Sequence, residues 1–303
     1  MGFSKNNLTG KNFQIRGFGI CLIAGFSVSG SAMNINDVYM NSPRICETEY
    51  YDMEQVEILR GPQGTLFGRN ATGGVVNLKT ARPILGEFGT NIEAQVGNYD
   101  HRKIKGAINI PVGEQLAVRI AGIYLDRDGY SENINDGSDV DDREQWSLRG
   151  SIRWEPTENT TIDLNGHYFD EDSTRTRSQK QLCDQGPNPI LGSLPTSLEF
   201  EPISAFSTSG QLLSSDLLLG ALGFLNFFAP ADVGATNPDD FRKVRNSFPP
   251  QYTADETFVM FEVQHEFANG LSLNWLGSYQ ESNSRSRQDF NGVSGDETGS
   301  VLQ

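Results

Sequence analysis

Two arginines, Arg60 and Arg69, flank a turn region in the stretch VEILRGPQGTLFGRNATGGVVNLKTARP, residues 56–83. A planar guanidinium suits bidentate pairing with carboxylates. These two arginines are therefore suited to forming ion pairs. Pro62 stiffens the first turn and cannot donate to a strand ladder. Glycines permit backbone angles or close approaches that a Cβ would obstruct. Five lie here: Gly61, Gly64, Gly68, Gly73 and Gly74. The flanking apolar residues predict two strands around a compact turn.

The sequence shows no arrangement of nucleophile and base residues suited to covalent catalysis. The three histidines, His101, His167 and His265, are dispersed along the chain. Asp163 and His167 would share one face of a strand, but a polar wall explains them without catalysis. RGFGICL lacks the third glycine of a dinucleotide motif, and GTLFGRN lacks the Lys-Ser/Thr of a phosphate-binding loop. The sequence therefore predicts a protein that is not an enzyme.

Net charge and cysteine spacing argue against several classes of partner and metal site. The net charge of −15 disfavours non-specific binding to nucleic acid. Cys21, Cys46 and Cys183 have no C-x-x-C spacing, which excludes a simple zinc ribbon. The acidic stretch 126–144 invites a calcium-loop interpretation, but Ile134 and Arg143 stand where oxygen ligands are needed. A solvated acidic loop is the better interpretation. No cofactor and no metal are expected.

The elements that must position these residues are strands. In REQWSLRGSIRWEP, an apolar face from Trp146 to Trp154 alternates with a polar face that carries Arg149 and Arg153. This two-residue period predicts a sheet with one apolar face. Similar alternation predicts seven strands, near 90–97, 102–111, 115–125, 145–154, 161–170, 256–267 and 271–280.

The length and polarity of these strands favour a membrane barrel. They approach or exceed the ~9–11 residues that a tilted strand needs to cross a bilayer. Arginine, aspartate and asparagine occupy the polar face at strand centres, as expected of a water-filled lumen, and Trp and Tyr recur near strand ends. Short connections at 111–115, 155–159 and 268–270 alternate with long ones at 126–144 and 172–255, except at the tight NYDH near residue 100. Outer-membrane barrels show this asymmetry. A soluble β-sandwich is the alternative.

VEILRGPQGTLFGRNATGG closely resembles the plug-domain signature of TonB-dependent outer-membrane receptors. Two earlier segments, FQIRGFG with Arg16, Gly17 and Gly19 and NINDVYM at 34–40, resemble further plug segments in the right order. In NINDVYM, Asn36 stands where the family typically has an aspartate-glycine hairpin. The resemblance implies a partial antiparallel transmembrane β-barrel with an N-terminal α+β plug. It places the plug in residues 1–83 and the barrel in 84–303.

The resemblance also implies function and partners. The parent protein would take up a scarce ligand, such as a metal chelate, cobalamin or saccharide, across the outer membrane of a Gram-negative bacterium. Its partners would be the TonB energy-transducing protein, outer-membrane lipid and the ligand. Arg60 and Arg69 would pair with carboxylates on the inner barrel wall; the alternative is that they only stabilise the turn.

Some features depart from the family or stay open. No counterpart of the TonB box stands out in MGFSKNNLTGKN, and seven strands are expected where family barrels have about 22. The chain therefore resembles an internal piece of a receptor. The external loop 172–255 includes a leucine-rich stretch expected to form a short helix, and either helps to capture the ligand or only covers other loops. A passive porin, a surface adhesin and an outer-membrane hydrolase are the functional alternatives.

Overall fold

The structure of the chain is a computed structural model that describes residues 2–6, 10–15, 30–40, 49–175, 242–244, 246 and 248–287. Arg16, Gly17, Gly19, the three cysteines and the predicted helix of the long loop lie outside these residues. Among the described residues, no helix combines the length and the apolar character needed to cross a membrane. The one described helix is α1 (Gly64–Phe67).

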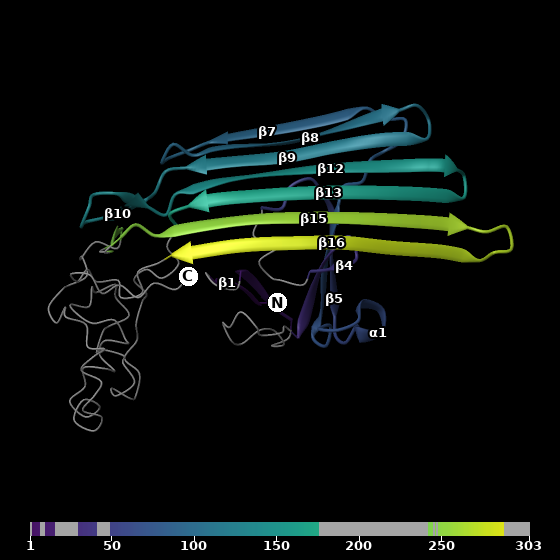
Figure 1. Cartoon of the computed structure of the whole chain (residues 1–303), viewed down its shortest axis with the longest axis horizontal. Coiled ribbons are helices and arrows are strands. Elements are labelled where there is room, and N and C mark those ends of the chain that lie inside the picture. The colour runs from purple at the N-terminus through teal and green to yellow at the C-terminus, as the bar shows by residue number, and fades with distance from the viewer. Residues whose placement is uncertain are drawn as a thin grey trace, which may run out of the picture. The chain divides into compact units, whose positions relative to one another are not determined.

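Seven long strands form one sheet, here called the wall, in which neighbours in sequence are neighbours in space. Adjacent arrows point in opposite directions (Figure 1), and the pairings of β7 with β8 and of β8 with β9 are antiparallel. All seven predicted strands are confirmed. The strands are β7 (Gly89–Val96), β8 (Arg102–Val112), β9 (Leu116–Arg127), β12 (Arg143–Thr157), β13 (Thr160–Ser173), β15 (Gln251–Glu266) and β16 (Ser272–Arg287).

The connections alternate as predicted, and the short β7–β8 turn at 97–101 is the expected exception. Short turns at 113–115, 158–159 and 267–271 lie together at one end of the wall (Figure 1). Gly113 and Gly270 have φ of 72° and 82° in these turns, a conformation that costs glycine little. The longer connections follow β9 and β13. We call the two ends of the wall the turn end and the loop end.

The wall has its apolar side chains outside and its polar side chains inside. Along β12, Trp146 and Trp154 are 41% and 46% exposed, whereas Gln145 and Arg149 are 3% and 5% exposed. A soluble sandwich buries its apolar face against a second sheet, so this inverted burial is incompatible with that alternative. A membrane barrel has this arrangement, with an apolar belt around a polar interior.

A second, four-stranded sheet has the order β4-β3-β6-β5. It consists of β3 (Ser31–Ile35), β4 (Val38–Tyr39), β5 (Met53–Arg60) and β6 (Gly74–Thr80). The glycine-rich stretch forms the antiparallel β5–β6 hairpin, with α1 in its connection, and β3 runs parallel to β6. The predicted strand–turn–strand arrangement is confirmed. We call this sheet with its flanking residues 49–52 and 81–83 the inner sheet.

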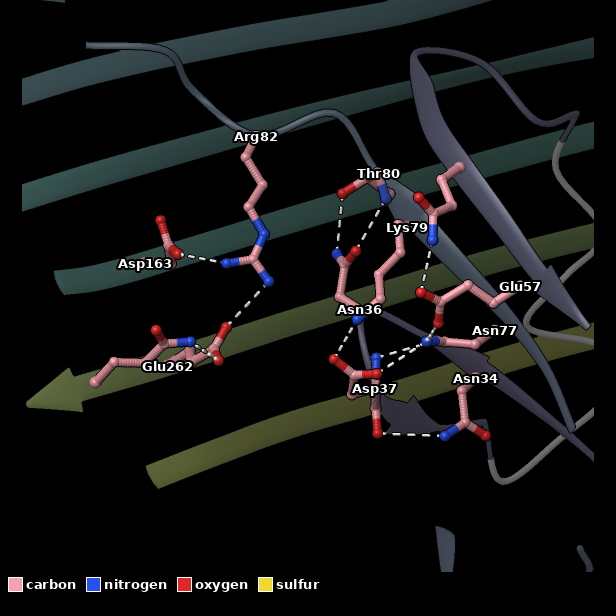
Figure 2. Close-up of polar contacts among 12 residues, drawn as sticks. Asn34, Asn36, Asp37, Glu57, Asn77, Lys79, Thr80, Arg82, Asp163 and Glu262 are labelled. Atoms are coloured by element: carbon pink, nitrogen blue, oxygen red, sulfur yellow. Dashed lines mark hydrogen bonds and ion pairs between the residues drawn. The ribbon is translucent and has the colours of Figure 1, made fainter. Parts of the chain in front are cut away.

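The β3–β4 hairpin turns through Asn36 and Asp37, with φ of 49° and 68°. Two successive positive φ values are characteristic of the tight turn that matches the twist of paired strands. Asn and Asp tolerate this region because their short polar side chains bond locally. The Asn36 side chain bonds to Thr80 (2.9 Å), and Asn77 bonds to Asp37 (2.8 Å) and Glu57 (2.7 Å; Figure 2). The turn therefore forms without the glycine typical of the family.

Two small sheets complete the described chain. β1 (Gly2–Asn6) and β2 (Gly10–Gln14) pair antiparallel. β10 (Ser131–Asn133), β11 (Asp139–Val140) and β14 (Lys243–Val244) form a three-stranded sheet that includes much of the acidic stretch. Five carboxylates of the stretch are exposed, as expected of a solvated acidic loop, whereas Asp141 is buried and Asp126 and Asp142 are half-buried; the exposed ones are Asp128, Glu132, Asp136, Asp139 and Glu144. The described residues contain no group of three or more His, Cys, Asp or Glu side chains placed to hold a metal ion.

Candidate functional site

The candidate site is the junction where the inner sheet meets the polar face of the wall. Two segments approach the wall: residues 49–52, which precede β5, and residues 81–87, which follow β6. These segments begin and end the β5–β6 hairpin, and the backbone N–H of Ala81 donates to the carbonyl of Asp52 at 3.0 Å. The hairpin is thus attached to the wall at its open end.

Asp52 is clamped by two arginines from neighbouring wall strands. Arg119 on β9 donates through Nε (2.9 Å) and Nη2 to the two carboxylate oxygens. Arg149 on β12 donates to the same carboxylate at 3.0 Å and to the Asp52 carbonyl at 2.7 Å. Burial alone would raise the pKa of Asp52, but the hydrogen bonds and positive charges of Arg119 and Arg149 outweigh it and lower the pKa. Asp52 is therefore ionised at neutral pH.

Tyr51 makes a second contact beside this clamp. Its hydroxyl lies 2.8 Å from Ser147 Oγ, and its ring lies under the guanidinium of Arg149, 5.0 Å from the ring centroid. Burial raises the pKa of Tyr51, so the hydroxyl keeps its proton at neutral pH. Tyr51 also packs in an apolar cluster with Ala107, Ala121 and Ile123 of the wall.

Ser147 and His167 form a serine–histidine pair that was not identified from the sequence. Ser147 Oγ lies 2.8 Å from His167 Nε2 and 2.9 Å from the carbonyl of Tyr168. Ser147 is only 3% exposed, and the cavity lined by His167 measures about 40 Å³. Such a space admits one or two water molecules but no ester or lipid substrate. The pair orients wall side chains and does not supply a hydrolase site.

Arg82, which follows β6 at the same open end of the hairpin, makes a second attachment to the wall (Figure 2). Its guanidinium lies 3.0 Å from Asp163 on β13 and 3.4 Å from Glu262 on β15. Arg153 of β12 pairs with the same Asp163 at 2.9 and 2.8 Å. Two guanidinium groups therefore face two carboxylates, and the cluster is close to neutral. Asp163 and His167 do lie on the inner face, as predicted, and both serve as polar wall residues.

Asn109 of β8 holds the backbone that leads from the inner sheet to the wall. Its Nδ2 donates to the carbonyls of Ile84 (2.8 Å) and Glu87 (2.6 Å), and its Oδ1 accepts from the Ile84 N–H at 2.9 Å. Asn109 is 2% exposed. One side chain thus satisfies three backbone groups of an otherwise irregular segment.

The remaining contacts are mainly apolar. Phe258 and Met260 of β15 are buried in one cluster with Met33 and Leu78 of the inner sheet. Gln280 of β16 donates to the Tyr39 carbonyl at 2.9 Å. Lys103 of β8 pairs with Glu49. The wall therefore holds the inner sheet through ion pairs, hydrogen bonds and apolar packing.

The residues singled out from the sequence lie mostly at the far end of the β5–β6 hairpin. Arg60 is exposed and forms no ion pair with any described residue. Arg69 is exposed and lies 5.5 Å from the centroid of the Tyr39 ring. Pairing of these two arginines with wall carboxylates stays a prediction. The ion pairs between plug and wall in the described residues involve Glu49, Asp52 and Arg82, and the sequence signal for them was the row of charges on the polar face of the wall strands.

The motif glycines occupy distinct environments. Gly61, Gly68 and Gly74 have φ of 98°, 72° and 145°. A Cβ on Gly74 would lie 2.3 Å from the Leu59 carbonyl oxygen, whereas one on Gly64 would meet nothing within 4 Å. The Gly73 carbonyl accepts from the Gly61 N–H at 3.1 Å, which closes the hairpin, and Pro62 is exposed beside it.

Comparison with known proteins decides the family. The family model described as TonB-dependent Receptor Plug Domain matches residues 2–75, which include the whole glycine-rich motif. The chain therefore carries a TonB-dependent receptor plug domain, and its curated relatives are TonB-dependent receptors. The inner sheet is accordingly its plug, and the chain is an outer-membrane protein. Its relatives are transport receptors, in agreement with the prediction that it is not an enzyme.

Curated relatives support this assignment. The metal-pseudopaline receptor CntO of Pseudomonas aeruginosa PAO1 is 30% identical over 170 residues, which are 54% of this receptor chain and 21% of the relative. The ferrioxamine B receptor of Salmonella typhimurium LT2 is 26% identical over 158 residues, 48% of the chain and 21% of the relative. The chain thus spans about a fifth of the length of these relatives.

Solved receptors share the fold. The ferric yersiniabactin uptake receptor FyuA of Yersinia pestis superposes with a TM-score of 0.65 at 16% identity, over 97% of this chain and 37% of that one. The ferripyoverdine receptor of the Pseudomonas aeruginosa outer membrane gives 0.59 at 15% identity, over 94% and 31%. The predicted combination of barrel strands and plug is therefore confirmed.

Proposed function

We propose that the chain supplies the plug and the first wall strands of a receptor that imports a metal chelate of the siderophore type. The plug comprises residues 1–83 and the wall residues 84–303 in this proposal. The observation that carries it is a compact inner sheet ion-paired to the polar face of a wall whose opposite face is apolar. The names of the curated relatives, a metal-pseudopaline and a ferrioxamine B receptor, support a chelate as the ligand.

The junction explains how such a receptor stays closed at rest. Asp52 and Arg82 place charges of opposite sign against the wall, and each finds complementary charges there. Withdrawing the plug would separate these pairs together with the Asn109 hydrogen bonds and the apolar contacts of Phe258 and Met260, so the plug does not leave spontaneously. In the proposed function, TonB, energised by the inner-membrane proton gradient, supplies the work that displaces it. Binding and displacement suffice, and no covalent step is involved.

Uptake measurements test the proposal. A strain that lacks the gene is compared with its complemented parent for accumulation of radiolabelled iron or nickel bound to a panel of hydroxamate, catecholate and opine-type chelators. At least one chelate is expected to accumulate only with the gene present, and accumulation should vanish in a tonB deletion. Accumulation of unchelated solutes that persists without TonB would favour a passive porin instead.

A further inference from the structure

Two open cavities lie between the plug and the wall on the side of β7, β8, β9 and β12. The first, about 450 Å³, is lined by charged groups that include Asp52, Glu93, Lys105 and Arg119. The second, about 510 Å³, is lined by Arg82, Arg119, Arg153 and Glu155, among others. Both fall in the size range of small-molecule sites. Both linings carry charged groups of both signs that can bind water and polar solutes, and the second also includes Pro83, Ile84 and Leu85.

The cavities follow one another along the strand axis. Arg119 pairs with Asn109 in the β8–β9 register, and Lys105 lies four residues further from the short turn at 113–115. Glu93 pairs with Lys105 in the β7–β8 register, so the first cavity lies toward the loop end. Glu155 stands just before the short turn at 158–159, so the second cavity lies toward the turn end.

The two cavities share lining residues beside the Asp52 clamp. Both are lined by Arg119 and Ala81, and Arg119 pairs with the carboxylate of Asp52, which lines the first cavity. Asp52 reaches this point from the plug, whereas Arg119 belongs to the wall. Separating the two side chains would join about 450 and 510 Å³ of polar space.

On the side of β15, the plug meets the wall through apolar packing. There Phe258 and Met260 pack against Met33 and Leu78, and the adjoining cavity measures about 40 Å³. Hydrating that contact would expose buried apolar surface, which is unfavourable. Opening the β7–β9 side would exchange the Asp52–Arg119 pair for hydrated charges, while Arg149 and the small Tyr51 cluster also hold the plug there.

We propose that these two cavities form a path for hydrated ions and small polar solutes along β7–β9, closed by the Asp52–Arg119 pair. The proposal rests on the proposed function, since it names the side of the plug on which that receptor opens. Arg119 is a gating residue of this path. Neither the chelate nor TonB is needed to detect it, so its test is independent of uptake.

Conductance across planar lipid bilayers that contain the protein expressed from its own gene is the first test. Arg119→Ala removes the gate from the wall and Asp52→Ala removes it from the plug. Each is expected to raise the conductance in potassium chloride several-fold without chelate or TonB. Gln280→Ala is the matched control, because it breaks a plug–wall hydrogen bond on the closed side. An unchanged conductance in both variants, or an equal rise in the control, would overturn the proposal.

Cysteine labelling locates the path independently. In a background with Cys21, Cys46 and Cys183 changed to serine, Glu93→Cys probes the loop-side cavity and Glu155→Cys the turn-side cavity. A membrane-impermeant thiol reagent should reach each cysteine from its own side only while Arg119 is present. With Arg119→Ala, both should react from either side. Unchanged sidedness in a protein whose wall is folded, judged by its heat-modifiable migration on gels, would contradict the path.

Discussion

Asp52 of the plug and Arg119 of wall strand β9 form a two-point ion pair, with Nε–Oδ2 at 2.9 Å, and Arg149 of β12 contacts the same carboxylate at 3.0 Å. Side chains 67 and 97 residues apart in the sequence therefore converge on Asp52. All three are largely buried, with 5% exposure for Asp52 and 6% for Arg149. The pair is thus more than a surface contact, and its consequences are measurable.

Asp52→Asn should loosen the plug strongly. The variant leaves Arg119 and Arg149 without their counter-charge, and loss of one partner of a buried pair costs about 3–5 kcal/mol. Hydrogen exchange of the β5 amides, which begin directly after Asp52, is expected to accelerate accordingly. The matched control is Asp100→Asn, since Asp100 pairs with Arg102 at the surface, where both side chains are more than half exposed. That change should cost less than about 1 kcal/mol. Equal effects of the two changes would refute the clamp.

The same clamp predicts a pH dependence. The pKa of Asp52 is lowered in the folded protein, so its contribution to stability is present above the unfolded value of about 3.9. It is lost as the pH falls through the depressed folded value. The difference in plug protection between wild type and Asp52→Asn should therefore be constant near neutral pH and shrink below about pH 4. A difference that grows with acidification would show that another group dominates.

Asn109→Asp should release the segment that leads from plug to wall. Aspartate keeps the acceptor for the Ile84 N–H, but it loses both donors and places a negative charge beside the carbonyls of Ile84 and Glu87. Unsatisfied buried groups cost about 1–3 kcal/mol each. Limited proteolysis between residues 83 and 88 should become markedly faster. Asn91→Asp, at an exposed position of β7, is the control and should leave the cleavage rate unchanged. A rate unaffected by either change would mean that Asn109 does not secure this segment.

The wall could be predicted from the sequence because the two-residue period is a local property of each strand. The ends of β15 and β16 were predicted less well. β15 begins at Gln251 and β16 ends at Arg287, so both strands extend beyond the predicted 256 and 280. These extensions carry residues such as Thr253 and Asn283 on the outer face. Where a strand leaves the bilayer, both faces are polar, and the alternation disappears.

The junction was harder to predict, because its pairs depend on which residues the folded plug brings to the wall. The charged residues of the polar face, such as Arg149, Arg153 and Asp163, were interpreted as the lining of a water-filled lumen, which names no partner for them. Nothing in the local sequence of Tyr51, Asp52 or Arg82 distinguishes them from other polar residues near strand ends. The glycine-rich motif drew attention to Arg60 and Arg69, which lie at the closed end of the hairpin, away from the clamped end.

Gly74→Ala should disrupt the plug, whereas Gly64→Ala should not. Gly74 has a φ of 145°, which L side chains rarely adopt, and a Cβ there would lie 2.3 Å from the Leu59 carbonyl oxygen and 2.9 Å from Ile15 Cδ1. Backbone strain and this clash together predict a loss of about 3 kcal/mol or more. Gly64 lacks both problems and begins α1, where alanine is favourable. Urea unfolding, monitored by hydrogen exchange in β5 and β6, distinguishes the two variants. Similar midpoints for both variants would contradict the described hairpin.

The three tryptophans of the chain, Trp146, Trp154 and Trp275, should all contact lipid. Each is 41–52% exposed on the outer face of the wall. Trp146 and Trp154 are separated by about 27 Å of extended strand, comparable to the ~25 Å apolar band of a barrel, and should lie near opposite interfaces. In vesicles, lipids brominated near the head groups should quench single-tryptophan variants at 146 and 154 more than lipids brominated near the bilayer centre. Leu66→Trp in a tryptophan-free background is the control, since Leu66 is exposed on the plug. It should respond to aqueous acrylamide and not to brominated lipid. Strong acrylamide quenching of Trp146 and Trp154 would place the apolar face in water and contradict the wall orientation.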